Sequence, residues 1–358
     1  MPTNPLIARA EAFCAAYGIR VPILLAPMAG ACPASLSIAV ANVGGLGACG
    51  ALLMQPAAIK AWASEMRAGS NGGFALNLWI PDPPPERNAV VEDAVRVFLR
   101  SFGPEVAREA GNVTPPDFAA QCEAMLEAGP AIISSIMGLY PADYVARMKA
   151  KGIKWFATAT TVAEARAAEA AGADVIVAQG MEAGGHRGAF DAAKAQAELV
   201  GLFALLPAIV DAVKVPVVAT GGIADARGIA AALMLGASAV QIGTGFLRCP
   251  EAKLSAAWAD ALGRAQPEDT MVSRAFSGRP GRSLATRYAR AAAAPDAPPP
   301  APYPVQRGLT QAMRDAATKI DDVDRMQAWA GQSARLAMAQ PAGDVVRELW
   351  SGVQALLR

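Results

Sequence analysis

The sequence predicts a (β/α)8 barrel, because short apolar runs alternate with alanine-rich helical stretches along most of the chain. This alternation is typical of βα units in a parallel sheet, and 358 residues supply material for one large domain or two ordinary ones. Eight units over about 250 residues fit a barrel, whereas a doubly wound sheet usually stops sooner. The expected strands cover residues 22–26, 45–49, 73–78, 131–135, 154–159, 174–179, 216–221 and 239–243.

Helix start and stop signals between these strands support the count. The stretch "TVAEARAAEAAGAD" has Thr161 and Glu164 at the spacing of a capping box, and Gly172 is a typical helix-stop residue. The stretch "DARGIAAALMLGAS" repeats the plan, with Asp225 as the expected N-cap and Gly236 as the stop. Two similar units suit neighbouring repeats of one barrel, although chance could also produce them.

Two regions do not fit the repeat. Residues 80–117 separate the third and fourth strands by more than one ordinary helix, and about a hundred residues follow the last strand. We therefore expect residues 1–250 to form the barrel with an insertion at about 80–117. Residues 251–358 are expected to form a mainly helical capping segment that closes the active site. A flexible linker or an oligomer contact is the alternative.

Composition favours a small-molecule partner. The chain has 32 Lys and Arg residues and 31 Asp and Glu residues. The net charge of +1 gives no excess of positive charge for binding nucleic acid or an acidic membrane surface. Five scattered cysteines without C-x-x-C spacing argue against a disulfide framework or a zinc site. The first 30 residues carry neither an export signal nor an apolar run of about 18 residues. We expect a cytoplasmic protein, and a homo-oligomer is compatible with the sequence.

The only histidine of the chain, His186, lies in the glycine-rich stretch "AQGMEAGGHRG" that follows the sixth expected strand. Active sites of barrels gather at this end of the strands, and glycines let a ligand approach the backbone closely. Without a second histidine or a carboxylate cluster, a metal site is not expected, and no G-x-S-x-G marks a hydrolase. The imidazole is therefore a candidate for proton transfer or for binding an anion. The alternative is a tight surface turn with an incidental histidine.

Two glycine turns indicate a phosphate site. Gly221, Gly222, Gly243 and Thr244 follow the seventh and eighth strands, where barrels commonly bind phosphate through backbone N–H groups. Neither turn has the pattern of an ATP-binding loop, and no G-x-G-x-x-G motif opens a helix after a strand. A phosphorylated ligand is the expected occupant.

Three further residues suit a flavin ring. Asn77 and Gln179 offer uncharged amides for a heterocycle with carbonyl and N–H edges, unless they only cap turns. Met28 could lie against a ring, although a methionine at a strand end is more often core filler.

Taken together, "APMAG", "AQGMEAGGHRG", "ATGGIAD" and "QIGTGF" resemble the nitronate monooxygenase family, formerly called 2-nitropropane dioxygenases. The segments "FSGRPGRSLATRY", "PYPVQRGLT" and "WAGQSARLA" are similar to the C-terminal tail of its class I members. The resemblance implies an FMN-dependent barrel with an added helical domain. It also implies oxidation of alkyl nitronates, such as propionate 3-nitronate, by molecular oxygen (O2) to a carbonyl compound and nitrite.

The resemblance also implies roles for individual residues. His186 takes the catalytic position. The residues implied to bind FMN are Met28, Asn77, Gln179, Gly184, Gly222, Gln241, Ile242, Gly243, Thr244, Trp329, Gly331 and Gln332. The active-site tyrosines of some members have no assigned match here, so the candidates are Tyr140, Tyr144, Tyr288 and Tyr303.

Two other functions stay open at this point. A flavin-dependent enoyl-acyl-carrier-protein reductase, which uses FMN and NADH, shares nearly all the barrel motifs, and a quinone reductase would use the same flavin chemistry. The non-enzymatic alternative is a barrel that binds a phosphorylated metabolite.

Overall fold

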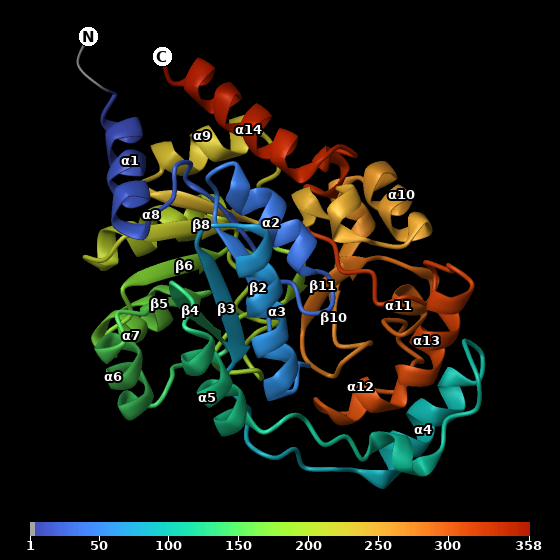
Figure 1. Ribbon diagram of the computed structural model, residues 1–358. Helices are drawn as coiled ribbons and strands as arrows, with labels where there is room; N and C mark the ends of the chain where they lie inside the picture. Colours follow the sequence, from blue (N-terminus) through green and yellow to red (C-terminus); the bar gives the residue numbers. More distant parts are fainter. Residues whose placement is uncertain (1–3) are drawn as a thin grey trace.

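The computed structural model describes residues 4–358 and confirms the predicted (β/α)8 barrel (Figure 1). Within these residues eight parallel strands pair in the order β1-β9-β8-β6-β5-β4-β3-β2. A bridge between Leu24 and Leu46 joins the first and last strands of this order and closes the barrel. The barrel strands are β1 (Ile23–Leu25), β2 (Gly47–Gly50), β3 (Phe74–Trp79), β4 (Ile132–Ile136), β5 (Lys154–Ala159), β6 (Val175–Gln179), β8 (Val217–Thr220) and β9 (Ala239–Ile242).

Helices cover the outside of the barrel. They are α1 (Pro5–Tyr17), α2 (Ala34–Asn42), α3 (Pro56–Gly69), α5 (Phe118–Ala128), α6 (Ala142–Ala150), α7 (Val162–Ala170), α8 (Leu202–Ala212) and α9 (Ala226–Met234). The predicted caps at Thr161 and Asp225 are confirmed, since their side chains accept hydrogen bonds from the N–H groups of Glu164 and Gly228.

Glu164 differs from the expected capping box. Its carboxylate accepts hydrogen bonds from the N–H and hydroxyl of Thr160, one residue before the N-cap, and from the N–H of Phe190 at 2.7 Å. The carboxylate therefore ties the end of β5 to the loop that follows His186.

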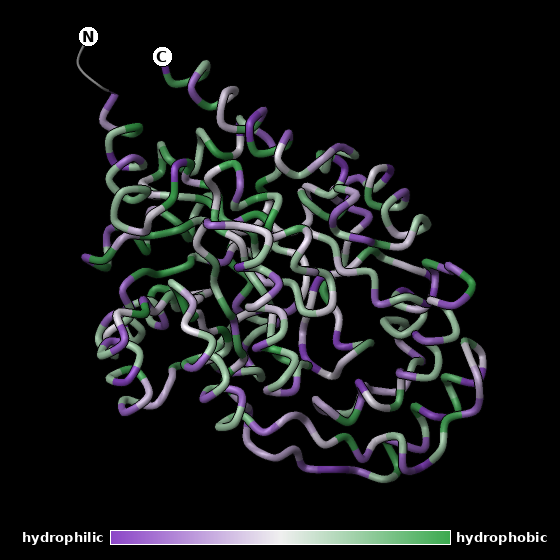
Figure 2. Tube along the Cα trace, in the orientation of Figure 1, coloured by the Kyte–Doolittle hydropathy of each residue, from purple (hydrophilic) through white to green (hydrophobic). Residues whose placement is uncertain are grey.

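The main hydrophobic core lies inside the barrel and between its strands and outer helices. Leu24, Ile133, Trp155 and Val218 are all almost fully buried. Figure 2 shows hydrophobic residues concentrated along the barrel strands. Burial of this apolar area, worth roughly 25 cal/mol per Å², is the main force that holds the barrel together.

The insertion and the C-terminal segment share a second core. The insertion contains α4 (Ala89–Leu99) and the 3-10 helix η1 (Arg108–Gly111). Val95 and Leu99 of α4 pack in one cluster with Tyr288, Leu309 and Met313 from the C-terminal segment. In Figure 1, α4 accordingly lies beside α12 and α13, away from the barrel.

The C-terminal segment is mostly helical. It contains α10 (Ala256–Arg264), α11 (Arg287–Ala291), α12 (Val305–Leu309), α13 (Gln311–Lys319) and α14 (Ala342–Leu356). The short 3-10 helices η2 (Thr244–Phe246) and η3 (Pro250–Ala252) lead from β9 into this segment, which also contains η4 (Pro267–Asp269) and η5 (Ala334–Leu336). The last helix, α14, packs back on α2 and α9 of the barrel. The division of the chain into two parts at residue 250 stays a prediction.

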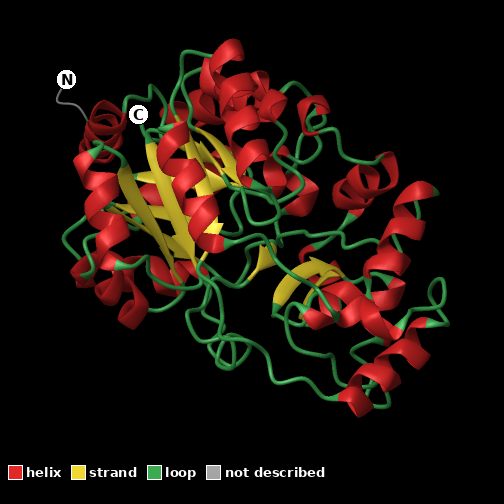
Figure 3. Ribbon diagram, turned by 60° about the horizontal axis from the view of Figure 1, so that its bottom comes forward, coloured by secondary structure: helices red, strands yellow, loops and turns green. Residues whose placement is uncertain are grey.

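A small antiparallel sheet connects the C-terminal segment to the barrel (Figure 3). It consists of β10 (Thr270–Ser273), β11 (Gly281–Leu284) and the two-residue strand β7 (Gly185–His186). His186 pairs with Gly281, so the histidine that follows β6 is an edge residue of this second sheet.

All five cysteines are buried and unpaired. Among residues 4–358, no helix combines the length and apolarity that a membrane span requires.

Candidate active site

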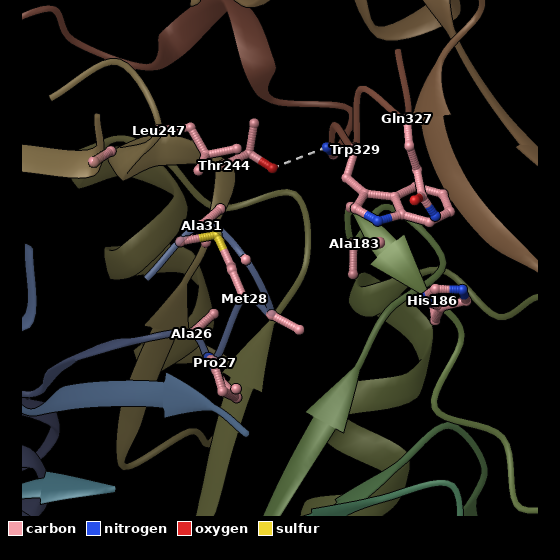
Figure 4. A pocket seen from close by; sticks show the side chains of 18 of the residues that line it. Ala26, Pro27, Met28, Ala31, Ala183, His186, Thr244, Leu247, Gln327 and Trp329 are labelled. Carbon is pink, nitrogen blue, oxygen red and sulfur yellow. Dashed lines mark hydrogen bonds between the residues drawn. The ribbon is translucent and has the colours of Figure 1, made fainter. Parts of the chain in front are cut away.

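A cavity of about 470 Å³ lies at the C-terminal ends of the barrel strands (Figure 4). Its size falls within the usual range of small-molecule sites, roughly 300–1,000 Å³. The predicted site residues on its wall are Met28, Asn77, Gln179, Gly184, His186, Gly222, Gln241, Gly243, Thr244, Trp329, and Gly331.

Two predicted site residues are not on this wall. Ile242 is 1% exposed and belongs to the hydrophobic core. Successive side chains of a strand point to opposite faces, so Ile242 points away from the cavity that its neighbour Gln241 reaches. Gln332 is half-buried, and its backbone N–H donates to the carbonyl of Glu182 at 3.0 Å.

His186 lies between two tryptophans. Its ring centroid is 4.6 Å from that of Trp79 and 4.7 Å from that of Trp329, with both pairs edge to face. Its Nε2 atom lies 2.7 Å from the hydroxyl oxygen of Ser277. The histidine is therefore fixed by contacts from the barrel and from the C-terminal segment, and Figure 4 shows it on the same side of the cavity as Trp329.

The electrostatic surroundings keep His186 neutral. Burial, together with the nearby cations of Arg279 and Arg307, lowers the pKa of His186 to about 3. At pH 7 one ring nitrogen therefore carries a proton and can donate a hydrogen bond, while the other accepts one. A base of this low pKa is poorly matched to proton abstraction near neutral pH, whereas a neutral N–H donor suits an anionic ligand.

The turn that carries His186 is held by Gln179 and Arg187. The amide of Gln179 donates to the carbonyl of His186 at 3.2 Å and accepts from the N–H of Gly188 at 2.8 Å. The Arg187 guanidinium, 1% exposed, donates to the carbonyl of Gly180 at 2.8 Å. Gln179 therefore positions the turn, and its second amide hydrogen is left to face a ligand.

The segment 329–333 closes the cavity by binding the glycine turns. The N–H of Gly331 donates to the Thr244 hydroxyl at 3.0 Å, as the dashed line in Figure 4 marks. The Ser333 hydroxyl donates to the carbonyl of Gly222 at 2.5 Å. A Cβ atom on Gly184 would lie 2.5 Å from the Gly331 nitrogen, so only glycine allows this close approach.

The turns after β8 and β9 leave backbone donors free. The N–H groups of Gly222, Gly243 and Thr244 donate no hydrogen bond within residues 4–358. Gly222 has φ +68°, a left-handed conformation that glycine adopts without strain. Thr244 opens only a short 3-10 helix, so the free N–H groups, and not a helix dipole, make this end of the cavity suitable for a phosphate.

Met28, after β1, and Asn77, on β3, complete the wall. The backbone N–H of Met28 donates to the Cys32 sulfur at 3.3 Å, which fixes the turn after β1. Asn77 is 5% exposed, and its amide nitrogen donates to the Ser134 hydroxyl at 3.0 Å. This bond orients the Asn77 side chain without using its carbonyl oxygen.

Of the four candidate tyrosines, Tyr303 is the one beside the site. Its ring centroid lies 5.3 Å from that of Trp79. The hydroxyls of the other three donate to backbone carbonyls of buried residues at 2.9–3.0 Å, and none of the three lines the cavity; they are Tyr140, Tyr144 and Tyr288.

A second cavity of about 420 Å³ lies behind Trp79 and Tyr303. The proline-rich run 81–85 and Phe118 contribute to its mainly apolar wall. Because Leu52 and Trp79 line both cavities, the indole of Trp79 forms part of the partition between them.

Sequence reasoning did not find Trp79, Ser277 or Arg307, all of which surround His186. Trp79 had a usable signal, because it follows Asn77 by two residues on the same strand and therefore shares its face. Ser277 and Arg307 lie about a hundred residues away, in the segments "FSGRPGRSLATRY" and "PYPVQRGLT", which the resemblance identified without giving either residue a role. In residues 4–358, no group of three or more histidine, cysteine or carboxylate side chains is arranged to hold a metal ion.

A family model described as nitronate monooxygenase matches residues 11–352. The chain belongs to the nitronate monooxygenase family. The nitronate monooxygenase of Pseudomonas aeruginosa is 38% identical over 344 residues, which cover 95% of this chain and 98% of that protein. The probable nitronate monooxygenase of Staphylococcus aureus (strain Newman) is 33% identical, with 95% and 96% coverage. The family predicted from the sequence motifs is confirmed, and the chain is an oxidoreductase.

Solved structures give a similar result. The nitroalkane oxidase of Streptomyces ansochromogenes has a TM-score of 0.88 and 34% identity, covering 96% of this chain and 98% of that one. FabK from Thermotoga maritima has a TM-score of 0.73 and 26% identity, covering 100% and 98%. The chain is therefore more similar to the nitroalkane oxidase than to FabK.

Proposed function

We propose that the chain binds FMN in the 470 Å³ cavity and oxidises alkyl nitronates with O2, giving a carbonyl compound and nitrite. Membership of the nitronate monooxygenase family supports nitronate oxidation as the reaction. The observation that carries the proposal is a neutral histidine held between two tryptophans in a cavity with free backbone donors at its other side.

The residues of the cavity fit FMN. The free N–H groups of Gly222, Gly243 and Thr244 would bind its phosphate. The Asn77 carbonyl and the second amide hydrogen of Gln179 would meet the polar edge of its ring system. When bound, FMN supplies the capacity to take electrons from the nitronate and pass them to oxygen.

His186 would bind the nitronate group. Its neutral imidazole offers an N–H to an anionic oxygen, and a hydrogen bond to a charged acceptor is worth about 1.5–3 kcal/mol. Trp79 and Trp329 place apolar ring surface against the imidazole, and an apolar surrounding strengthens a hydrogen bond. Because the pKa of His186 is about 3, the proposed substrate is the nitronate anion and not the neutral nitroalkane.

The test is anaerobic mixing of the FMN-loaded protein with propionate 3-nitronate and, separately, with NADH and with neutral nitroethane. We expect a rapid change of the flavin absorbance with the nitronate alone, and nitrite release when oxygen is admitted. Bleaching by NADH without a response to the nitronate would support reduction of an enoyl thioester or quinone instead. A purified protein that is colourless and does not bind added FMN would contradict both flavin functions.

Neutral nitroethane tests the second part of the proposal. Fast turnover of neutral nitroethane would show that His186, or another group, removes the α proton. That outcome would overturn the proposed restriction of the substrate to the nitronate anion.

A further inference from the structure

The second cavity, of about 420 Å³, differs chemically from the first. Prolines of the runs 81–85 and 115–116, together with Pro304, supply much of its wall, and the rings of Trp79 and Phe118 add apolar surface. Proline has no backbone N–H to offer a ligand. An apolar molecule therefore gains free energy by entering this cavity, whereas an anion would lose its hydration without finding a partner there.

Three polar side chains on this wall are already engaged. Asp82 forms an ion pair with Arg279, and Arg87 forms one with Glu92. The amide nitrogen of Gln121 donates to backbone carbonyls at 2.8–3.3 Å. Because these groups have partners within the protein, they add little attraction for a polar ligand.

The cavity extends from the surface to the reacting end of the first cavity. Its outer wall is formed by the segments that run side by side between the barrel and α4 (Figure 1), where Pro83 and Pro84 are exposed. Its inner wall includes Val305, which is 2% exposed, and Trp79. The ring centroid of Trp79 lies 4.6 Å from that of His186. The indole is therefore the layer between this cavity and the histidine proposed to bind the nitronate.

We propose that the second cavity takes up O2 from solvent and delivers it past Trp79 to the His186 end of the first cavity. This inference rests on the proposed nitronate oxidation, which consumes O2. The two reactants differ as the two cavities do, because the nitronate is an anion and O2 is apolar. Leu52 and Trp79 line both cavities, so movement of these side chains connects them. Separate routes keep O2 and the anion from competing for one entrance.

Xenon tests the uptake directly, because this apolar atom occupies apolar cavities. Val113 lines the second cavity, whereas its neighbour Thr114 is exposed and lies outside the wall. Val113→Trp should therefore fill the cavity, and Thr114→Trp is the matched control. Xenon NMR on the FMN-loaded protein should show binding in the parent and in Thr114→Trp, and weaker binding in Val113→Trp. No binding in the parent, or equal binding in all three proteins, would overturn the assignment.

Delivery of O2 can be measured without a nitronate. The FMN-loaded protein is reduced with dithionite and mixed with O2, and the flavin absorbance follows reoxidation. The second-order rate constant should fall roughly 3- to 10-fold in Val113→Trp, which corresponds to an added barrier of about 0.7–1.4 kcal/mol, and stay unchanged in Thr114→Trp. Equal rate constants in the parent and Val113→Trp would refute the route.

A variant of opposite sense keeps the test open if Val113→Trp does not fold. Trp79→Leu removes most of the layer between the cavities and should raise the rate constant of reoxidation, and an unchanged or lower value would contradict delivery past the indole. Slower reoxidation in Val113→Trp without nitronate turnover in the parent would refute only the proposed reaction. Nitronate turnover with equal reoxidation in all variants would refute only the O2 route.

Discussion

The close approach of Gly184 to the closing segment makes Gly184→Ala a sharp test of how the cavity is built. The added Cβ would lie 2.5 Å from the Gly331 nitrogen, 2.7 Å from the Ala330 carbonyl carbon and 2.9 Å from the Thr244 hydroxyl. Two of these atoms are backbone, so no side-chain rotation relieves the contact. The segment 329–333 must move by about 1 Å to restore an ordinary separation.

The magnitude follows from two costs. Overpacking of this kind typically costs about 1–3 kcal/mol. Displacement of Gly331 also breaks its hydrogen bond to Thr244, worth about 1 kcal/mol. We therefore expect a loss of roughly 2–4 kcal/mol in the free energy of unfolding. With an unfolding entropy of about 2.1 cal/mol/K per residue, the melting temperature Tm should fall by roughly 3–5 °C.

Calorimetry would measure Tm, hydrogen exchange would report the mobility of residues 329–333, and absorbance would report retained FMN. The matched control is Gly73→Ala, whose Cβ would approach no atom closer than 3.4 Å. Faster exchange in 329–333 and weaker FMN retention are expected for Gly184→Ala alone. If both variants keep the Tm and FMN content of the parent protein, the proposed closure by this segment is wrong.

Three further predictions concern the aromatic end of the cavity. His186→Asn should lower kcat/KM for nitronates by roughly 10- to 150-fold, because it removes a hydrogen bond to a charged acceptor. The absorbance spectrum of bound FMN should stay unchanged, and loss of FMN would indicate that His186 has a structural role. The folded protein holds the pKa of His186 at about 3, against about 6.5 when unfolded, so the unfolded chain binds the proton first as pH falls. His186 should therefore lower the free energy of unfolding by at most about 5 kcal/mol as the pH falls from about 6.5 to about 3. Denaturant titrations should show a smaller decrease of this free energy in His186→Asn than in the parent protein. Equal decreases in the two proteins would contradict the low pKa. Trp79→Leu should join the two cavities. The KM for a bulky nitronate, such as that of phenylnitromethane, should then fall relative to the KM for propyl-1-nitronate. An unchanged ratio of these two KM values would show that the indole does not separate the cavities.

The barrel could be predicted from sequence because each of its units repeats local signals. An apolar run, a capping residue such as Thr161 or Asp225 and a glycine stop are all encoded within about 15 residues. The strand ends then follow from the rule that parallel strands meet at one edge, which is why Met28, Asn77, Gln179 and Thr244 were found.

The surroundings of His186 could not be predicted in this way. Strand β7 has two residues, too few for any alternation, and it exists only because β11 pairs with it. Ser277 and Arg307 reach the site through packing of the C-terminal segment, which has no repeat. Ile242 stays a prediction: the motif match named a whole run of residues, and alternation along β9 directs this side chain into the core.

The pairing of His186 with Gly281 sets an order of events during synthesis. Domains fold from the N-terminus as the chain leaves the ribosome, so all eight barrel strands are available before residue 281 emerges. A nascent chain that stops between residues 243 and 276 has its histidine but lacks Ser277, Trp329 and the strand that pairs with His186. The contacts that surround His186 are therefore complete only after Trp329 has been synthesised.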